Sequence, residues 1–181
     1  AGITKFGIGT LVLSSTTSDF TGGVRINQGT LSISADTNLG NTGNGITFNG
    51  AGTLTMTTAV TTSRAITLNN GAIASIYSPA GSTSIISGAV TGNGGVTWGN
   101  TSMNVNHNIQ FNSTGNTFTG PLTVGVASAN TTSAMTMNSI ADSASQLIMN
   151  GGGQGVSWTY GSGAIAPLTF NNRQIVLKTS D

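Results

Sequence analysis

Short runs of alternating apolar and hydroxyl residues dominate the chain, and turn-forming Gly or Asn residues close each run. The clearest runs are GTLVL (9–13), GTLSIS (29–34), GTLTMTT (52–58) and SAMTMNS (133–139). A period of two residues places alternate side chains on opposite faces of a β-strand. The pattern therefore predicts many short strands, each with one apolar face. Gly or β-branched residues interrupt every window long enough for a helix, so no helix is expected.

The second half of the chain repeats the first half in altered form. Four pairs of segments align in the same order, and the offset between partners grows from 93 through 98 and 101 to 109 positions. An offset that grows in one direction indicates one unit copied once, followed by short insertions at turns of the second copy. The aligned pairs are 2–13 with 95–105, 20–26 with 118–124, 46–52 with 147–153, and 63–68 with 172–177.

This duplication predicts the domain organisation and the fold class. Residues 1–94 are expected to form a first repeat unit, and residues 95–181 a second, degenerate and incomplete unit of the same continuous solenoid. Because the second copy stops before it matches residues 73–94, we expect a segment of a longer array. Units of many short strands with Gly or Asn turns are typical of stacked coils. We therefore predict an all-β fold, a parallel β-solenoid, with an antiparallel sandwich as the second alternative.

The composition excludes several classes of protein. Charged residues make up only 5% of the chain, and the net charge of +1 gives no electrostatic footprint for nucleic acid. No apolar run approaches the roughly 18 residues of a membrane-spanning helix, so membrane insertion by this segment is not expected. The absence of cysteine excludes disulfides and thiolate metal sites.

Residues 3–34 resemble a known repeat family. Their order is K-x-G-x-G-T-L-x-L-S, a polar loop, T-G-G, an apolar strand and G-T-L. This order is similar to the autotransporter-associated β-strand repeat, a passenger-type repeat of large bacterial surface proteins. In the second copy Trp98 stands at the place of Lys5, and Pro121 at that of Gly23. The residues on the pattern are Lys5, Gly7, Gly9, Thr10, Leu11, Leu13, Ser14, Thr21, Gly22, Gly23, Gly29, Thr30 and Leu31, with Gly115, Phe118, Thr119 and Gly120 in the second copy.

The resemblance implies a right-handed parallel β-helix in a bacterial protein that is secreted or displayed at the cell surface. Repeats of this family typically form a stalk or passenger region, so the pattern residues are expected to be structural. Phe20 and Phe118 are expected to pack a loop onto the solenoid, and Gly22 and Gly120 to form the turn that follows.

Two features of the corners follow from residue types alone. Arg64 and Arg173 match across the copies, each just before an apolar strand, and are predicted to bond main-chain carbonyls at a coil corner. Pro121 lacks the backbone donor that Gly23 retains, so the two corners cannot be hydrogen-bonded in the same way.

No catalytic residue, cofactor site or metal site is predicted, and the chain is not expected to be an enzyme. Polysaccharide hydrolysis needs paired carboxylates, but Asp36 and Asp142 occupy matching places in the two copies, which favours a turn or cap. His107 has no second His, Cys or nearby acid, which favours a polar loop residue over a metal ligand.

The sequence thus predicts a structural extracellular segment, a rigid stalk or scaffold whose partners are neighbouring repeats of its parent chain. Two alternatives stay open. A glycan-binding adhesin module would use Trp98, which is expected to point outward, where its ring can stack on a sugar or contact a partner. A self-associating fibre subunit would join end to end through unpaired strands at the solenoid ends.

Overall fold

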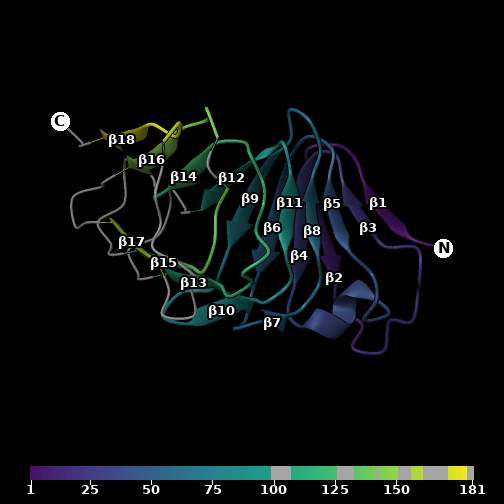
Figure 1. The fold of residues 1–181 in the computed structure, drawn as a ribbon. Helices are drawn as coiled ribbons and strands as arrows, with labels where there is room; N and C mark the ends of the chain where they lie inside the picture. The colour runs from purple at the N-terminus through teal and green to yellow at the C-terminus, as the bar shows by residue number, and fades with distance from the viewer. Residues whose placement is uncertain (99–106, 126–132, 142, 151–155, 161–170, 179–181) are drawn as a thin grey trace.

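The computed structural model describes residues 1–98, 107–125, 133–141, 143–150, 156–160 and 171–178. In this part of the chain the backbone winds into a β-solenoid, from β1 at one end to β18 at the other (Figure 1). Every described strand pair is parallel, which confirms the predicted parallel solenoid and leaves no place for the antiparallel sandwich.

Three parallel sheets follow the solenoid axis. Sheet A contains β1 (Ile3–Lys5), β3 (Val24–Ile26), β5 (Ile46–Phe48), β8 (Ile66–Leu68) and β11 (Val90–Gly92). Sheet B contains β2 (Thr10–Leu13), β4 (Gly29–Ile33), β6 (Ala51–Met56), β9 (Ile73–Tyr77), β12 (Gly95–Trp98), β14 (Leu122–Val124), β16 (Leu147–Asn150) and β18 (Ile175–Lys178). Sheet C contains β7 (Thr61–Thr62), β10 (Thr83–Ile86), β13 (His107–Phe111), β15 (Ser133–Met137) and β17 (Val156–Tyr160).

Short corners of Asn and Gly carry the chain from sheet A to sheet B. Asn27, Asn49 and Asn69 each follow a strand of sheet A directly and lie above one another at this corner. The Asn49 side chain donates to Asn27 Oδ1 at 2.7 Å, and the Asn69 side chain donates to Asn49 Oδ1 at 2.6 Å. This amide ladder adds side-chain hydrogen bonds between coils at an exposed corner.

Interior side chains stack in columns because the strands of sheet B keep a constant register. Each member of a column packs on the same-facing residue of the coils before and after it, so apolar surface is buried continuously along the axis. The longest column consists of Leu11, Leu31, Leu54, Ile76, Trp98, Val124, Met149 and Leu177.

Trp98 belongs to this interior column, and the prediction that it points outward is wrong. Its side chain is 0% exposed and lies between Ile76 and Val124 in register. In β12 Gly95, Val96 and Trp98 are buried, whereas Thr97 between Val96 and Trp98 is only half-buried and faces outward. A ring without exposed surface cannot stack on a sugar, so the fold does not support a glycan contact at this residue.

The error at Trp98 comes from its match with Lys5. A lysine in an alternating strand was assumed to face solvent, but Lys5 is only 6% exposed and lies in the interior column of Ile26, Phe48 and Leu68. The matched positions of the two copies therefore both face inward.

The sequence alignment of the two halves matches residues that occupy equivalent register positions in two different sheets. In sheet A the register column is Ile3, Val24, Ile46 and Ile66, and in sheet B it is Val96, Leu122, Leu147 and Ile175. Aligned segments therefore stack in the same order but lie in different sheets. The repeated sequence specifies a stacking register that works in either sheet, and the boundary between residues 94 and 95 stays a prediction.

Among the described residues one 3-10 turn, η1 (Asp36–Leu39), interrupts the strands where no helix was expected. The side-chain oxygen of Asn38 accepts the N–H groups of Ser34 and Ala35, both at 2.8 Å, and its amide donates to Ser15 O at 2.8 Å. Helix propensity does not predict this turn. The turn is held instead by the buried Asn38 side chain, which bonds it to the preceding coil.

Replacement of Trp98 tests its inward orientation. Trp98→Ala should lower the free energy of unfolding by about 3–5 kcal/mol, because a fully buried indole is lost. Thr97→Ala, the adjacent outward position, should stay within about 0.5 kcal/mol of the wild type. Urea unfolding followed by circular dichroism measures both, and equal losses would contradict the assignment.

Candidate functional site: the corner clamps

Three buried cations occupy coil corners and donate to main-chain carbonyl groups; we call Lys5, Arg64 and Arg173 the corner clamps. They are 6%, 2% and 5% exposed. A buried charge is unfavourable unless it is paired and hydrogen-bonded, so each clamp depends on the carbonyl oxygens around it. The sequence predicted carbonyl bonding for both arginines, and the structure confirms it.

Lys5 clamps the first corner between sheets A and B. Its Nζ donates to Phe6 O at 2.7 Å, to Gly7 O at 2.6 Å and to Gln28 O at 3.2 Å. The three donors of the ammonium group are therefore all used. Because Gln28 belongs to the next coil, the clamp joins two coils as well as closing its own corner.

Gly29 fits against this clamp in a conformation that side chains avoid. Its φ is +74°, and a Cβ at this position would collide with Gly7 O and lie 2.7 Å from both Gly9 O and the Lys5 Nζ. The G-T-L element of the repeat pattern therefore needs its glycine for backbone conformation and for space. Gly9 differs, because a Cβ there would meet no atom within 4 Å.

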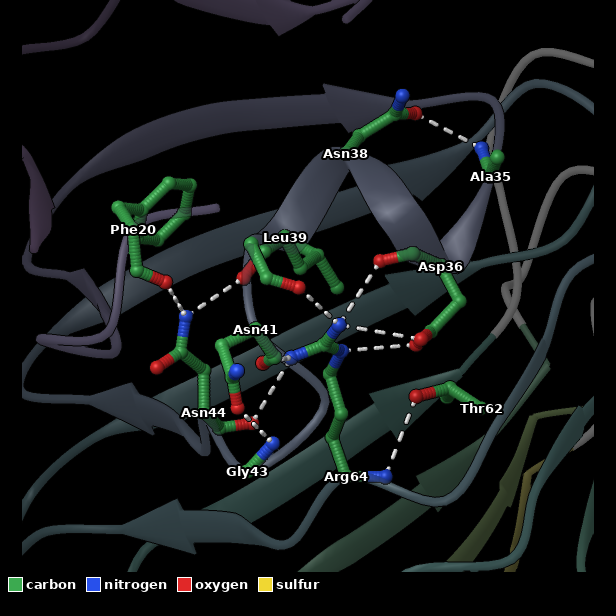
Figure 2. A network of polar contacts seen from close by, with 11 residues as sticks. Phe20, Ala35, Asp36, Asn38, Leu39, Asn41, Gly43, Asn44, Thr62 and Arg64 are labelled. Atoms are coloured by element: carbon green, nitrogen blue, oxygen red, sulfur yellow. Dashed lines mark hydrogen bonds and ion pairs between the residues drawn. The ribbon is translucent and has the colours of Figure 1, made fainter. Parts of the chain in front are cut away.

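Arg64 forms the most extensive clamp, just before β8 (Figure 2). Its Nη1 donates to Asn41 O at 2.6 Å and to Asn44 O at 3.2 Å, and its Nη2 donates to Gly40 O at 2.8 Å. The planar guanidinium presents five N–H donors in a fixed fork, which suits several carbonyls arranged around one point.

Asp36 completes the Arg64 clamp from the first turn of η1. Its Oδ1 accepts Arg64 Nε at 2.8 Å, and its Oδ2 and main-chain oxygen each accept Nη2 at 3.1 Å (Figure 2). Sequence analysis assigned Asp36 to a turn and missed this ion pair. The sequence does contain a pattern that could have indicated this ion pair. An acid and an arginine occur at matching places in both copies, as Asp36 with Arg64 and Asp142 with Arg173.

Asn44 organises the corner that faces the Arg64 clamp. Its Nδ2 donates to Phe20 O at 2.7 Å and to Leu39 O at 3.0 Å, and its Oδ1 accepts Gly23 N at 3.2 Å. Phe20 packs against the core as predicted. Gly40, at φ +77°, has no room for a Cβ beside Phe20 O, which would lie 2.5 Å away.

The second copy keeps the arginine and changes the surrounding corner. Arg173 donates through Nη1 to Gly120 O at 3.1 Å and through Nη2 to Ala141 O at 3.0 Å. Phe118 is fully buried. Pro121 cannot donate and cannot reach the φ of +74° that Gly23 adopts, so the corners do differ in hydrogen bonding. Asp142 lies outside the described residues.

The remaining pattern residues line the strands and turns next to the clamps. Thr10 and Thr30 face outward in register, and Leu11 and Leu31 face the core. The Gly22 N–H donates to Ala1 O at 2.7 Å, and the Thr119 N–H donates to Gly92 O at 2.9 Å. The other pattern positions in the described part are Gly7, Gly9, Leu13, Ser14, Thr21, Gly23, Gly115 and Gly120.

His107 begins β13 and is 5% exposed, so the prediction of a polar loop residue is wrong. Its Nδ1 lies 2.8 Å from Ser78 O. Within the described ranges there is no group of three or more His, Cys, Asp or Glu that could hold a metal ion. These ranges also contain no helix long and apolar enough to cross a membrane.

Replacement of Arg64 tests the clamp. Arg64→Met should cost about 3–5 kcal/mol of unfolding free energy, because Asp36 and three carbonyls lose a buried partner. Asp36→Asn should cost less, since the carbonyl bonds remain. Arg25→Met is the matched control at an exposed site, where the guanidinium makes one bond, to Gly22 O at 3.1 Å. Equal melting temperatures for Arg64→Met and Arg25→Met would show that the clamp is dispensable.

Replacement of Gly29 tests the fit against Lys5. Gly29→Ala should destabilise the first coils by more than 1 kcal/mol, because an alanine at positive φ is strained and its Cβ has no space. Gly9→Ala should leave the melting temperature nearly unchanged. Differential scanning calorimetry compares the two variants, and the reverse order of stability would refute this role of Gly29.

Comparison with known proteins agrees with the repeat pattern. Residues 3–33 match the family profile of the passenger-associated-transport-repeat. The chain is also 41% identical over 88 residues to the Adhesin BmaC autotransporter of Brucella suis biovar 1 (strain 1330). That alignment covers 49% of the chain and 2% of the relative's length. No solved structure matches the chain. The resemblance drawn from residues 3–34 is thereby confirmed, and residues 3–33 carry a passenger-associated-transport-repeat.

Proposed function

We propose that this chain is a rigid stalk segment of a bacterial surface protein and holds other parts of its parent outside the cell. The observation that carries this proposal is sheet B, an unbroken parallel ladder of eight strands from β2 to β18. Its inner face carries an apolar column from Leu11 to Leu177. Neighbouring repeats of the same parent chain are its proposed partners.

The mechanism is mechanical. Bending the rod requires that ladder hydrogen bonds stretch on one side and that close-packed interior side chains separate. The corner clamps add resistance, because Lys5 bonds carbonyls of its own coil and of the next coil, and Arg64 ties its corner to carbonyls of the preceding coil. A chain held this way keeps a fixed length between its ends.

The sparse charge supports a role in a variable external medium. With nine charged Asp, Lys and Arg residues among 181, few surface interactions are open to screening by salt. The ion pair of Arg64 with Asp36 is shielded from solvent, because the Arg64 side chain in it is 1% exposed. We propose a location outside the cell, at the surface or secreted.

Adhesion is assigned to other parts of the parent protein. The matched relative is named an adhesin, but the alignment covers 2% of it. Glycan binding by this segment is not proposed, because the burial of Trp98 removes the aromatic contact on which that alternative depended.

Spin labelling tests the stalk directly. The chain contains no cysteine, so Thr16→Cys and Thr159→Cys, both at exposed positions, give two unique sites near opposite ends. Double electron–electron resonance should give one narrow distance distribution. The distribution should be the same at low salt and in roughly 1 M salt, where the Debye length falls to about 3 Å.

The Arg64→Met variant with the same two labels is the internal control. It should broaden the distribution, because the corner between the labels loses its clamp. A broad distribution in the unmodified background would identify the chain as a flexible linker and would rule out the stalk.

A further inference from the structure

We propose that Asn70 and Gly71 form a site of covalent self-modification, at which the Asn70 side chain is converted to aspartate and isoaspartate. The pair lies at the corner between β8 and β9. The reaction needs water and no enzyme. It is independent of the proposed stalk role, and it distinguishes this pair from the other Asn-Gly pairs of the chain.

The chemistry requires an asparagine followed by a residue that does not obstruct its own main-chain nitrogen. The Gly71 nitrogen attacks Cγ of Asn70, a C–N bond forms, and the side-chain amide nitrogen leaves as ammonia together with the proton of the Gly71 N–H. The product is a five-membered succinimide. Water then opens the ring at one of its two carbonyls, which gives aspartate or isoaspartate. Glycine suits this attack because it has no Cβ.

Asn70 and Gly71 are an insertion that the neighbouring coils do not have. The corner between β5 and β6 consists of residues 49 and 50, and the corner between β11 and β12 consists of residues 93 and 94. The corner between β8 and β9 has four residues, 69–72, although the strands on either side of it keep their register. Two residues therefore project from the stack of corners.

This pair is exposed and unrestrained in the middle of the solenoid. Both residues are exposed, and neither the Asn70 side chain nor the Gly71 N–H is hydrogen-bonded to any residue that the structure describes. Gly71 has a φ of +77°, and a Cβ added to it would meet no atom within 4 Å. One hydrogen bond closes the turn, from Ala72 N to Asn69 O at 2.9 Å. Coils lie on both sides of the corner, so its exposure belongs to the solenoid itself.

Two other Asn-Gly pairs in the described ranges are protected because the asparagine side chain is bonded. Asn44 is 4% exposed, its amide donates to two main-chain carbonyls, and its oxygen accepts a main-chain N–H. Asn49 is exposed but belongs to the amide ladder, in which it donates to Asn27 and accepts from Asn69. Each side chain must lose these hydrogen bonds before its Cγ can reach the following nitrogen.

The pair of Asn93 and Gly94 is protected at its nitrogen instead. The Gly94 N–H donates to Leu68 O at 3.1 Å, and Gly94 is buried. This nitrogen cannot turn toward a side chain unless the corner opens locally. Of the four pairs that lie wholly within the described residues, only Asn70–Gly71 combines an unbonded side chain, an unbonded nitrogen and exposure of both residues.

Modification at this corner changes the surface of the solenoid and leaves its interior in place. At neutral pH the new carboxylate takes the formal net charge of the chain from +1 to 0. Isoaspartate also lengthens the main chain by one methylene. Because the inserted residues stack on no neighbouring corner, Leu68 and Ile73 can keep their register. Modified chains therefore accumulate with time while the coils stay folded.

Incubation of the folded chain at mildly alkaline pH, followed by tandem mass spectrometry of its peptides, tests the site. Asn70 should exchange ammonia for water, and isoaspartyl methyltransferase should label the same peptide. Asn44, Asn49 and Asn93 should react at least about ten times more slowly, the effect of a local opening that costs about 1.4 kcal/mol. In urea all four should react at similar rates. Asn70→Gln should abolish the fast reaction and leave the slow ones unchanged.

Two aspartate variants test whether the corner tolerates the product. Asn70→Asp should stay within about 0.5 kcal/mol of the wild type in unfolding free energy. Asn49→Asp should melt at a lower temperature, because a carboxylate cannot donate to Asn27 Oδ1 and is placed against it. Differential scanning calorimetry compares the two variants.

A folded chain in which Asn49 or Asn93 reacts as fast as Asn70 would overturn the proposal, and so would an Asn70 that stays unmodified while the chain in urea reacts. Equal destabilisation by Asn70→Asp and Asn49→Asp would show that the insertion is part of the stack, and would refute the accumulation of folded, modified chains.

Discussion

Main-chain carbonyl groups at the coil corners are the constraint on which the rest of this structure depends. A parallel ladder satisfies backbone groups within strands, but the corners turn carbonyls toward the interior, where no strand partner exists. Lys5, Arg64 and Arg173, three of the five basic residues, supply the missing donors. The chain thus places most of its few basic side chains in the interior, whereas Arg25 is exposed. With the corners fixed, each coil returns to a register in which apolar residues can stack.

Neutral amides meet the same requirement at other corners. Asn38, Asn44 and Asn116 are 0%, 4% and 2% exposed, and each uses its oxygen to accept a main-chain N–H and its amide to donate to a carbonyl. Where the chain bends, an asparagine side chain can therefore supply the hydrogen bonds that a neighbouring strand supplies within a sheet. The abundance of Asn, which in composition alone suggests loops, reflects in part this interior role.

Sequence reasoning found the strands and their stacking because a period of two residues and an ordered internal repeat are direct consequences of the fold. It failed at Lys5 and Trp98 because alternation fixes which residues share a face but not which face is inside. A lysine was assigned to solvent, whereas its apolar stem suits an interior column once carbonyls surround the ammonium. The Asp36 pair with Arg64 joins residues 28 positions apart, and only the spatial return of the coil brings them together. The burial of His107 was missed for the same reason, because it depends on the neighbouring coils rather than on the local sequence.

Sheets A and C each accompany only part of the described solenoid, whereas sheet B accompanies all of it. Tension applied along the axis is therefore shared by sheets A and B near the first coils and by sheets B and C near the last. All three sheets share it only where β7 to β11 overlap (Figure 1). The part in which all three sheets run side by side is therefore the stiffest. The direction in which the rod bends most easily differs between its two halves, because a different sheet accompanies sheet B in each half.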